Sequence, residues 1–155
     1  MELGKSSIKK FLICHENEYT KGDNSCLQEL PLKPLIPIRG TDNYVSAYAY
    51  ETFFGDYVEQ LRVDKLAVNY EFMCETQDEL DNFNDVIKNK INLYNSRFFY
   101  MNYFHPGIGW YFSKIYIGTP INSEAQLIET DTGLDTVTKI TMSIIEVEGT
   151  KMFDQ

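Results

Sequence analysis

The chain has 155 residues and a mass of 18.0 kDa, which is enough for one domain and leaves little room for a second core. Hydrophobic residues make up 43% and aromatic residues 14%, so a folded chain is expected rather than a disordered one. The 23 acidic residues outnumber the 14 basic ones, and the formal net charge of −9 argues against binding nucleic acid by counterion release. No apolar run is long enough for a membrane span, and no signal-peptide pattern begins the chain.

The first part of the chain has the least regular pattern. Residues 8–15 are typical of a short strand or an extended arm, and a polar, turn-rich stretch follows them. Three prolines between Leu30 and Gly40 exclude a helix or a central strand there and predict an extended connection that lies on the domain or on a neighbouring subunit. We therefore expect two parts: residues 1–43, an N-terminal strand with an extended Pro-rich arm, and residues 44–155, a β-sandwich domain with one helix.

The middle of the chain predicts strands followed by a helix. Residues 44–62 can be read as two strands turning at Gly55-Asp56 or as an interrupted helix, and their Tyr and Phe content favours strands. Apolar residues alternate at period two over 63–74, which predicts a half-buried strand. Thr76 then precedes Glu79 at capping-box spacing, so a helix should cover about residues 77–94 with an apolar face against a sheet.

The remaining segments predict two hairpins. Residues 97–104 and 110–118 are strongly β-prone and are joined by a turn of Pro and Gly. Both faces of this hairpin are largely apolar, so it should be covered on both sides or meet a partner. A second pair is expected at 125–128 and 136–148, turning at 131–133. The predicted fold class is mainly β (α+β): an antiparallel β-sandwich or barrel with one flanking helix and an extended N-terminal arm.

Cysteine and histidine usage predicts no disulfide framework and no zinc motif. Cys14 and Cys74 should pack as small apolar residues inside strands. His105 is expected to be a turn residue, and the acidic residues near 129–135 a solvated turn rather than a calcium site. We expect no cofactor, no metal and no catalytic residue. The alternative of a thiol or metal-dependent enzyme would use residues among Cys14, His15, Cys26, Cys74 and His105.

The order of elements over residues 63–149 is an alternating strand, a capped helix, an aromatic hairpin and a closing strand. This order resembles the tail-tube-like fold of bacteriophages, which tail tube proteins share with the first domain of distal tail proteins. The resemblance implies a virion structural protein made in the host bacterial cytoplasm. It also implies a homo-oligomeric ring, typically a hexamer, that contacts other tail proteins and forms a tube, distal tail or connector-type ring. DNA would be passing cargo, without specific binding.

The first functional hypothesis is therefore a non-enzymatic, ring-forming tail protein, in which net negative charge lets DNA slide. Added salt should strengthen assembly, because it screens repulsion between acidic subunits. The alternative is a monomeric β-sandwich module that binds a carbohydrate or small ligand through Tyr and Trp faces. The predicted subunit-interface residues of the first hypothesis are Leu32, Leu35, Ile36, Trp110 and Phe112.

Overall fold

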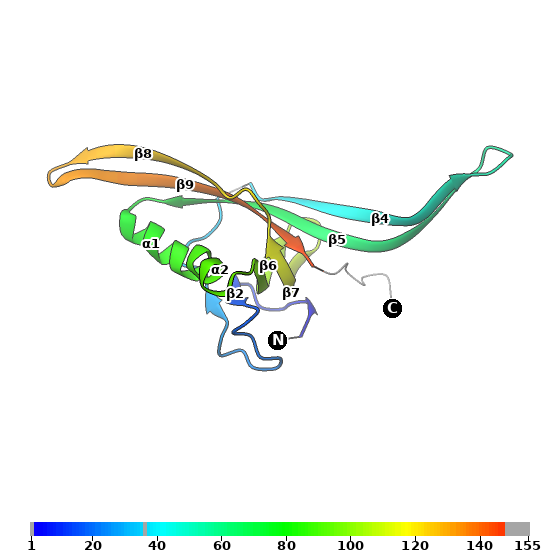
Figure 1. Ribbon diagram of the computed structural model, residues 1–155, viewed down its shortest axis with the longest axis horizontal. Helices are drawn as coiled ribbons and strands as arrows, with labels where there is room; N and C mark the ends of the chain where they lie inside the picture. The colour runs from blue at the N-terminus through cyan, green and yellow to red at the C-terminus, as the bar shows by residue number, and fades with distance from the viewer. Residues whose placement is uncertain (1, 36, 148–155) are drawn as a thin grey trace.

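The computed structural model describes residues 2–35 and 37–147, and within residues 41–50 and 58–65 it describes the backbone alone (Figure 1). The chain forms mainly antiparallel β-structure with one bent helix. Its elements are, in order, β1 Gly4–Lys5, β2 Leu12–His15, β3 Gln28–Glu29, β4 Arg39–Glu51, β5 Tyr57–Cys74, α1 Gln77–Val86, α2 Lys88–Tyr94, β6 Phe98–His105, β7 Gly109–Ile117, β8 Asn122–Thr130 and β9 Gly133–Glu146.

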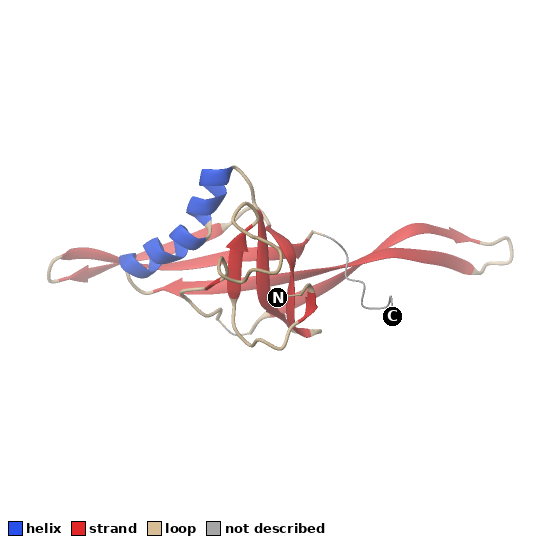
Figure 2. Ribbon diagram, turned by 90° about the horizontal axis from the view of Figure 1, so that it is seen from below, coloured by secondary structure: helices blue, strands red, loops and turns tan. Residues whose placement is uncertain are grey.

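These strands belong to one open sheet with the order β3-β2-β6-β7-β9-β5-β4, to which β8 adds on β9 and β1 adds on β7. The sheet folds over where the end of β7 pairs with the end of β9. As a result, β4, β5, β8 and β9 form a long layer, and the shorter β2, β6 and β7 lie across it on one side (Figures 1 and 2). The predicted β-sandwich with one flanking helix is confirmed, and the sheet does not close into a barrel.

The period-two pattern of β5 accounts for the main core. Leu66, Val68, Tyr70, Phe72 and Cys74 are all buried, as the alternation predicts. Residues 67–74 pair with residues 138–145 of β9, whose even-numbered residues are also buried. The strand predicted at 63–74 is therefore confirmed, and in the structure it begins earlier, at Tyr57. The two strands predicted over 44–62 are likewise β4 and the first half of β5.

The helix begins at the predicted cap. The Thr76 side chain accepts a hydrogen bond from the Glu79 N–H (3.2 Å), while the Glu79 carboxylate accepts one from the Glu75 N–H (2.8 Å). The helix bends at Ile87, between α1 and α2, and ends at Asn95, which has a left-handed conformation. Phe83 of α1 packs on Phe72 of β5, so the predicted apolar face lies on the sheet.

The cap supplies a direct test of the helix start. Thr76→Ala should lower the free energy of unfolding by about 1 kcal/mol, because it leaves the Glu79 N–H without its acceptor. Urea unfolding followed by circular dichroism measures this loss. Ser7→Ala, at an exposed position outside the helix, is the control and should change stability by less than about 0.5 kcal/mol. Equal stability of the two variants would contradict the role of the cap.

The N-terminal segment covers the outer face of the predicted aromatic hairpin, now β6–β7. β2 pairs with β6, β1 pairs with β7, and Tyr19 stacks on Tyr100 with ring centroids 3.9 Å apart. The outer face of the hairpin is therefore covered in part by its own chain, and Phe98 on this face stays 39% exposed. The Pro-rich arm also lies on its own domain, because the Leu35 N–H donates to the Glu71 carbonyl of β5 (2.7 Å). β4 begins at Arg39, so the predicted boundary at residue 43 falls inside a strand.

Candidate functional site

Two β-hairpins extend beyond the core at opposite ends of the long layer (Figures 1 and 2). β5 pairs with β9 from Ala67 to Cys74, so in the described chain residues 57–66 of β5 pair with β4 alone. In the same way, residues 133–137 of β9 pair with β8 alone. Two-stranded ribbons are at best marginally stable in water without a further packing partner. Both hairpins therefore have surfaces suited to contact with another molecule.

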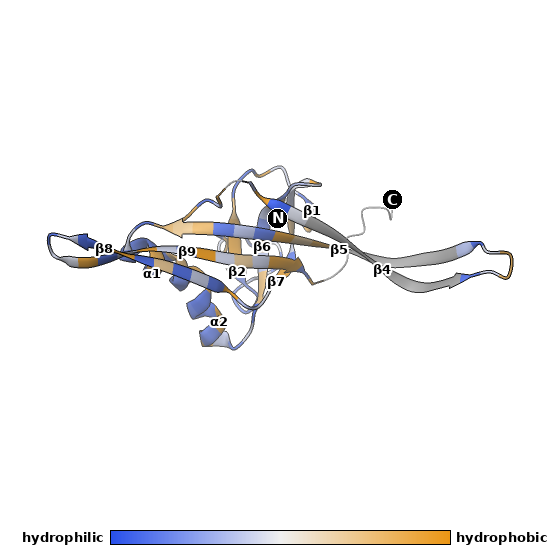
Figure 3. Cartoon of the chain, turned by 90° about the horizontal axis from the view of Figure 1, so that it is seen from above, coloured by the Kyte–Doolittle hydropathy of each residue, from blue (hydrophilic) through white to orange (hydrophobic). Residues whose placement is uncertain are grey.

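Large apolar side chains are exposed on both hairpins. Phe53 and Phe54 in the β4–β5 turn are 98% and 89% exposed, and Figure 3 shows this turn in the hydrophobic colour. Every residue of β8 is exposed, Leu127 to 64%, and Leu134 of β9 is 67% exposed. Exposed apolar clusters of this kind are typical of sites that bind other proteins. The sequence analysis did not single out these residues, although aromatic residues beside a predicted Gly-Asp turn were a visible signal.

The long layer also ends in two open sheet edges. Among the described residues, the outer edges of β4 and β8 pair with no other strand. Open edges present unpaired N–H and C=O groups that can extend a sheet into another chain. β8, β9, β5 and β4 alternate in direction, so β8 of a second copy placed beside β4 would continue the antiparallel pattern.

The predicted interface residues do not form one cluster. Leu32 and Trp110 meet in a groove on the N-terminal side of the domain. Leu35 is partly exposed where the arm runs beside β5, and Ile36 lies outside the described residues. Phe112 is 0% exposed and packs near Tyr19 and Tyr100 inside its own chain. The assignment of these five residues to a subunit interface stays a prediction.

The residues of the enzyme hypothesis lie in structural positions. Cys14 and Cys74 are buried in β2 and β5, as predicted, and burial raises the pKa of both thiols, which disfavours the reactive thiolate. The His105 ring is buried at the end of β6, where its Nδ1 accepts a hydrogen bond from the Gly107 N–H (2.9 Å). Among the side chains that the structure describes, no three of His, Cys, Asp or Glu are grouped so that they could hold a metal ion.

The aromatic rings of the β6–β7 hairpin, which the carbohydrate-binding alternative would use, differ in exposure. Phe99, Tyr103, Tyr111 and Phe112 are buried, Tyr100, Phe104 and Trp110 are half-buried, and Phe98 is 39% exposed. A buried ring cannot offer its face to a sugar, so the four buried rings give this alternative no support.

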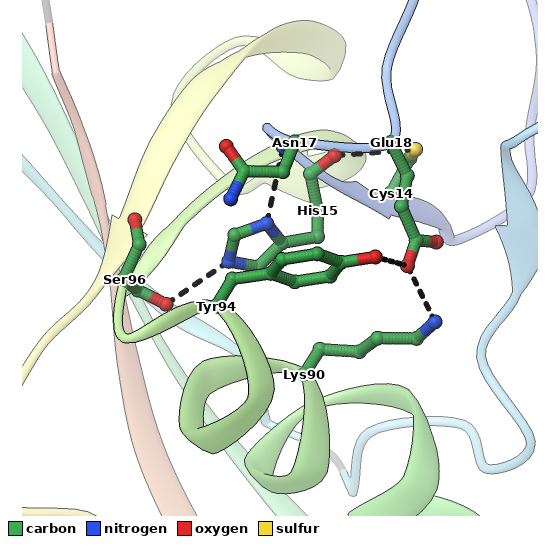
Figure 4. A network of polar contacts seen from close by, with 7 residues as sticks. All are labelled: Cys14, His15, Asn17, Glu18, Lys90, Tyr94 and Ser96. Carbon is green, nitrogen blue, oxygen red and sulfur yellow. Dashed lines mark hydrogen bonds and ion pairs between the residues drawn. The ribbon is translucent and has the colours of Figure 1, made fainter.

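A polar network fastens the N-terminal loop to α2 (Figure 4). The Glu18 carboxylate accepts hydrogen bonds from the Lys90 ammonium and from the Tyr94 hydroxyl (2.8 Å). The His15 ring contacts the Ser96 carbonyl through Nε2 (3.0 Å) and accepts from the Asn17 N–H at Nδ1 (3.1 Å), so Nε2 carries the proton that is donated to Ser96. The network positions residues 15–18 against α2.

The ion pair in this network predicts a pH-dependent contribution to stability. The Lys90 hydrogen bond lowers the pKa of Glu18, while Glu18 raises the pKa of Lys90. Because its pKa is lower in the folded chain, Glu18 binds a proton more readily in the unfolded chain. The contribution of the ion pair to the free energy of unfolding is therefore complete above about pH 5, and it is lost as pH falls through the lowered pKa. On the alkaline side, the contribution is lost only as pH rises through the raised pKa of Lys90.

Accordingly, Glu18→Gln should lower the free energy of unfolding by about 0.5–1 kcal/mol at pH 7. The difference from the unmodified chain should shrink as pH falls from about 5 through the lowered pKa of Glu18. Urea unfolding across this pH series measures it. Glu2→Gln, at an exposed position without an ion pair to another described residue, is the control. A difference that stays constant with pH would contradict this role of the Glu18–Lys90 pair.

Comparisons with known proteins give similarities to solved structures. No family model matches the chain, and no curated protein matches it. A chain of the tail of an empty gene transfer agent particle with C6 symmetry is 11% identical, with a TM-score of 0.39 over 90% of this chain and 92% of that chain. A chain of the virion of a native gene transfer agent particle is 14% identical, with a TM-score of 0.39 over 89% of this chain and 92% of that chain. The predicted resemblance to tail proteins is confirmed as a weak one.

No helix in the described part of the chain is both long and apolar enough to cross a membrane.

Proposed function

We propose that the chain is a non-enzymatic structural protein of a phage-type tail that assembles with copies of itself into a ring through which DNA passes. The observation that carries the proposal is the four-stranded layer β8-β9-β5-β4, which leaves two long sheet edges unpaired in the described chain. A monomer with such edges is at risk of uncontrolled association, and closure of a ring is a physical solution to that risk.

The strand directions favour ring closure. A rotation that places β8 of one copy beside β4 of the next keeps every neighbouring pair antiparallel. Six copies with four strands each would join about 24 strands, and at about 4.8 Å per strand the barrel would measure about 115 Å around, or about 37 Å across before strand tilt. Barrels with fewer strands than this already enclose a channel, so such a ring would have an open lumen.

Charge supports a passive role toward DNA. At a net charge of −9, each copy repels the phosphate backbone, so DNA would slide and not bind. The remaining features of the proposal are the hexameric symmetry, the contact with other tail proteins, the location in the virion after synthesis in the host cytoplasm, and the division into a 1–43 arm region and a 44–155 β domain.

The experiment that tests the proposal is light scattering after size-exclusion chromatography, combined with negative-stain imaging of the purified chain. Rings or short tubes of one diameter are expected, and their fraction should rise with protein concentration and with added salt. A monomer at every concentration and salt level would contradict the proposal.

A further inference from the structure

The turn of the β4–β5 hairpin is an ordered acidic loop that presents two aromatic rings. The Thr52 N–H donates to the Asp56 carbonyl (2.6 Å), and the Asp56 N–H donates to the Thr52 hydroxyl (3.0 Å). Phe53 and Phe54 project from this loop almost fully exposed, with their rings 5.6 Å apart. Residues 51–60 include three acidic residues, Glu51, Asp56 and Glu59, and no basic residue. We call residues 51–57 the acidic tip.

A groove on the N-terminal side has the opposite character. It has a volume of about 410 Å³, and its apolar lining includes Leu32 and Trp110. Lys9, Lys10 and Lys33 line it as well, and none of them forms an ion pair with another described residue. On a chain with a net charge of −9, three lysines around an apolar groove form a local basic site. We call this site the lysine groove; its full lining is Lys9, Lys10, Phe11, Glu29, Leu30, Leu32, Lys33 and Trp110.

The acidic tip cannot reach the lysine groove of its own chain. Tyr57 lies nine positions before Leu66, where β5 becomes part of the core, and an extended strand spans about 30 Å over nine positions. Figure 1 shows the tip at one end of the molecule and the N-terminal segment below its centre. A tip that docks into the groove must therefore belong to another copy.

We propose that the acidic tip of one copy docks into the lysine groove of another copy. Phe53 and Phe54 would bury their rings against the apolar lining, and Glu51 and Asp56 would face the three lysines. Both halves of the contact are present on one chain. Neither the tip carboxylates nor the three lysines form an ion pair with another described residue, and Glu29 adds one carboxylate to the groove lining. The contact rests on the proposed self-assembly, and it is distinct from the pairing of β4 with β8, which uses backbone groups.

The groove is better suited to a protein tip than to a phosphate. A phosphate group would engage the lysines and leave the apolar lining exposed. The tip would pair its carboxylates with the lysines and cover the apolar lining with its two phenylalanine rings. The two exposed phenylalanines, in turn, need an apolar surface that a solvated hairpin end does not provide.

Charge reversal tests the docking. Glu51→Lys with Asp56→Lys reverses the tip, and Lys10→Glu with Lys33→Glu reverses the groove. Each pair should weaken self-association about tenfold or more, because like charges then face each other across the contact. The four changes together should restore it. An equimolar mixture of the two singly reversed chains should also assemble, because each tip then meets a groove of opposite charge.

Controls separate this contact from the effect of net charge. Lys5→Glu with Lys21→Glu changes net charge as much as the groove reversal does, at exposed positions outside the groove, and should weaken assembly less than the groove reversal does. A photo-crosslinking residue in place of Phe54 should couple to the peptide containing residues 9–11 or 30–33 of a second copy. Circular dichroism checks that every variant is folded.

The outcomes distinguish this docking from the proposed function. If the unmodified chain assembles but the reversed tip and groove have no effect, or the crosslink lies outside the groove, the docking is overturned and ring formation stands. If the groove reversal abolishes binding of a short DNA duplex and leaves assembly intact, the groove holds phosphate and the docking is overturned. If the unmodified chain never assembles, both proposals fail.

Discussion

Phe72→Ala is expected to lower the free energy of unfolding by about 3–5 kcal/mol. The Phe72 side chain is 0% exposed near the C-terminal end of β5, and its ring centroid lies 4.8 Å from that of Phe83 on α1. Alanine would leave a cavity between the long layer and the helix, and the rigid strands on either side restrict collapse around it. Urea unfolding followed by circular dichroism, in dilute protein, measures the loss.

Phe54→Ala is the matched control, because it removes the same atoms from a side chain that is 89% exposed. It should change the free energy of unfolding by less than about 0.5 kcal/mol. A comparable loss in both variants would show that burial in the described core does not account for the stability of the fold.

The second large effect is expected at the β8 edge. Thr130 pairs with Gly133 across a two-residue turn, so these two residues exchange both backbone hydrogen bonds. In an antiparallel pair, every second residue bonds to the partner strand, so the even-numbered residues of β8 bond to β9. The N–H of the odd-numbered Ala125 therefore points away from β9, toward the open edge. Ala125→Pro removes this donor without removing a bond to β9. If β8 pairs with β4 of the next copy, the variant should shift the population from rings to monomers.

Ala125→Ser is the control, since it keeps the N–H and changes little else at an exposed position. Sedimentation velocity and negative-stain imaging should show rings for Ala125→Ser and monomers for Ala125→Pro, with similar circular dichroism spectra. Rings in both samples would exclude pairing through this edge and would leave self-assembly to other surfaces.

Local sequence was sufficient for most of the elements. The alternation from Leu66 to Cys74 predicted which side chains of β5 are buried, because a strand turns successive residues to opposite faces. Thr76 and Glu79 marked the helix start, because a capping box satisfies backbone donors within four residues of one another. The same holds for the turn after His105 and the turn near Asp131.

The candidate site was less accessible to prediction. Phe112 was predicted at a subunit interface on its aromatic character, and its place in an interface stays a prediction. Its burial in a single copy, by residues near Tyr19 almost one hundred positions away, was not predicted. Leu32 and Trp110, which share a groove, were among the predicted interface residues, but the lysines around them were not. The sequence analysis did not identify Phe53 and Phe54 as exposed, because an apolar residue beside a turn can be buried or exposed depending on where the hairpin ends relative to the core.

The sequence by itself determined the strands, the helix with its cap, the turns and the apolar faces, since each depends on residues that are neighbours in the chain. The tertiary structure decided which strand edges stay open, how far the hairpins extend beyond the core, and that the Pro-rich arm lies on β5 of its own domain. These features depend on the register between segments such as 67–74 and 138–145. Such pairing is selected by the packing of the whole chain, and no local pattern specifies it.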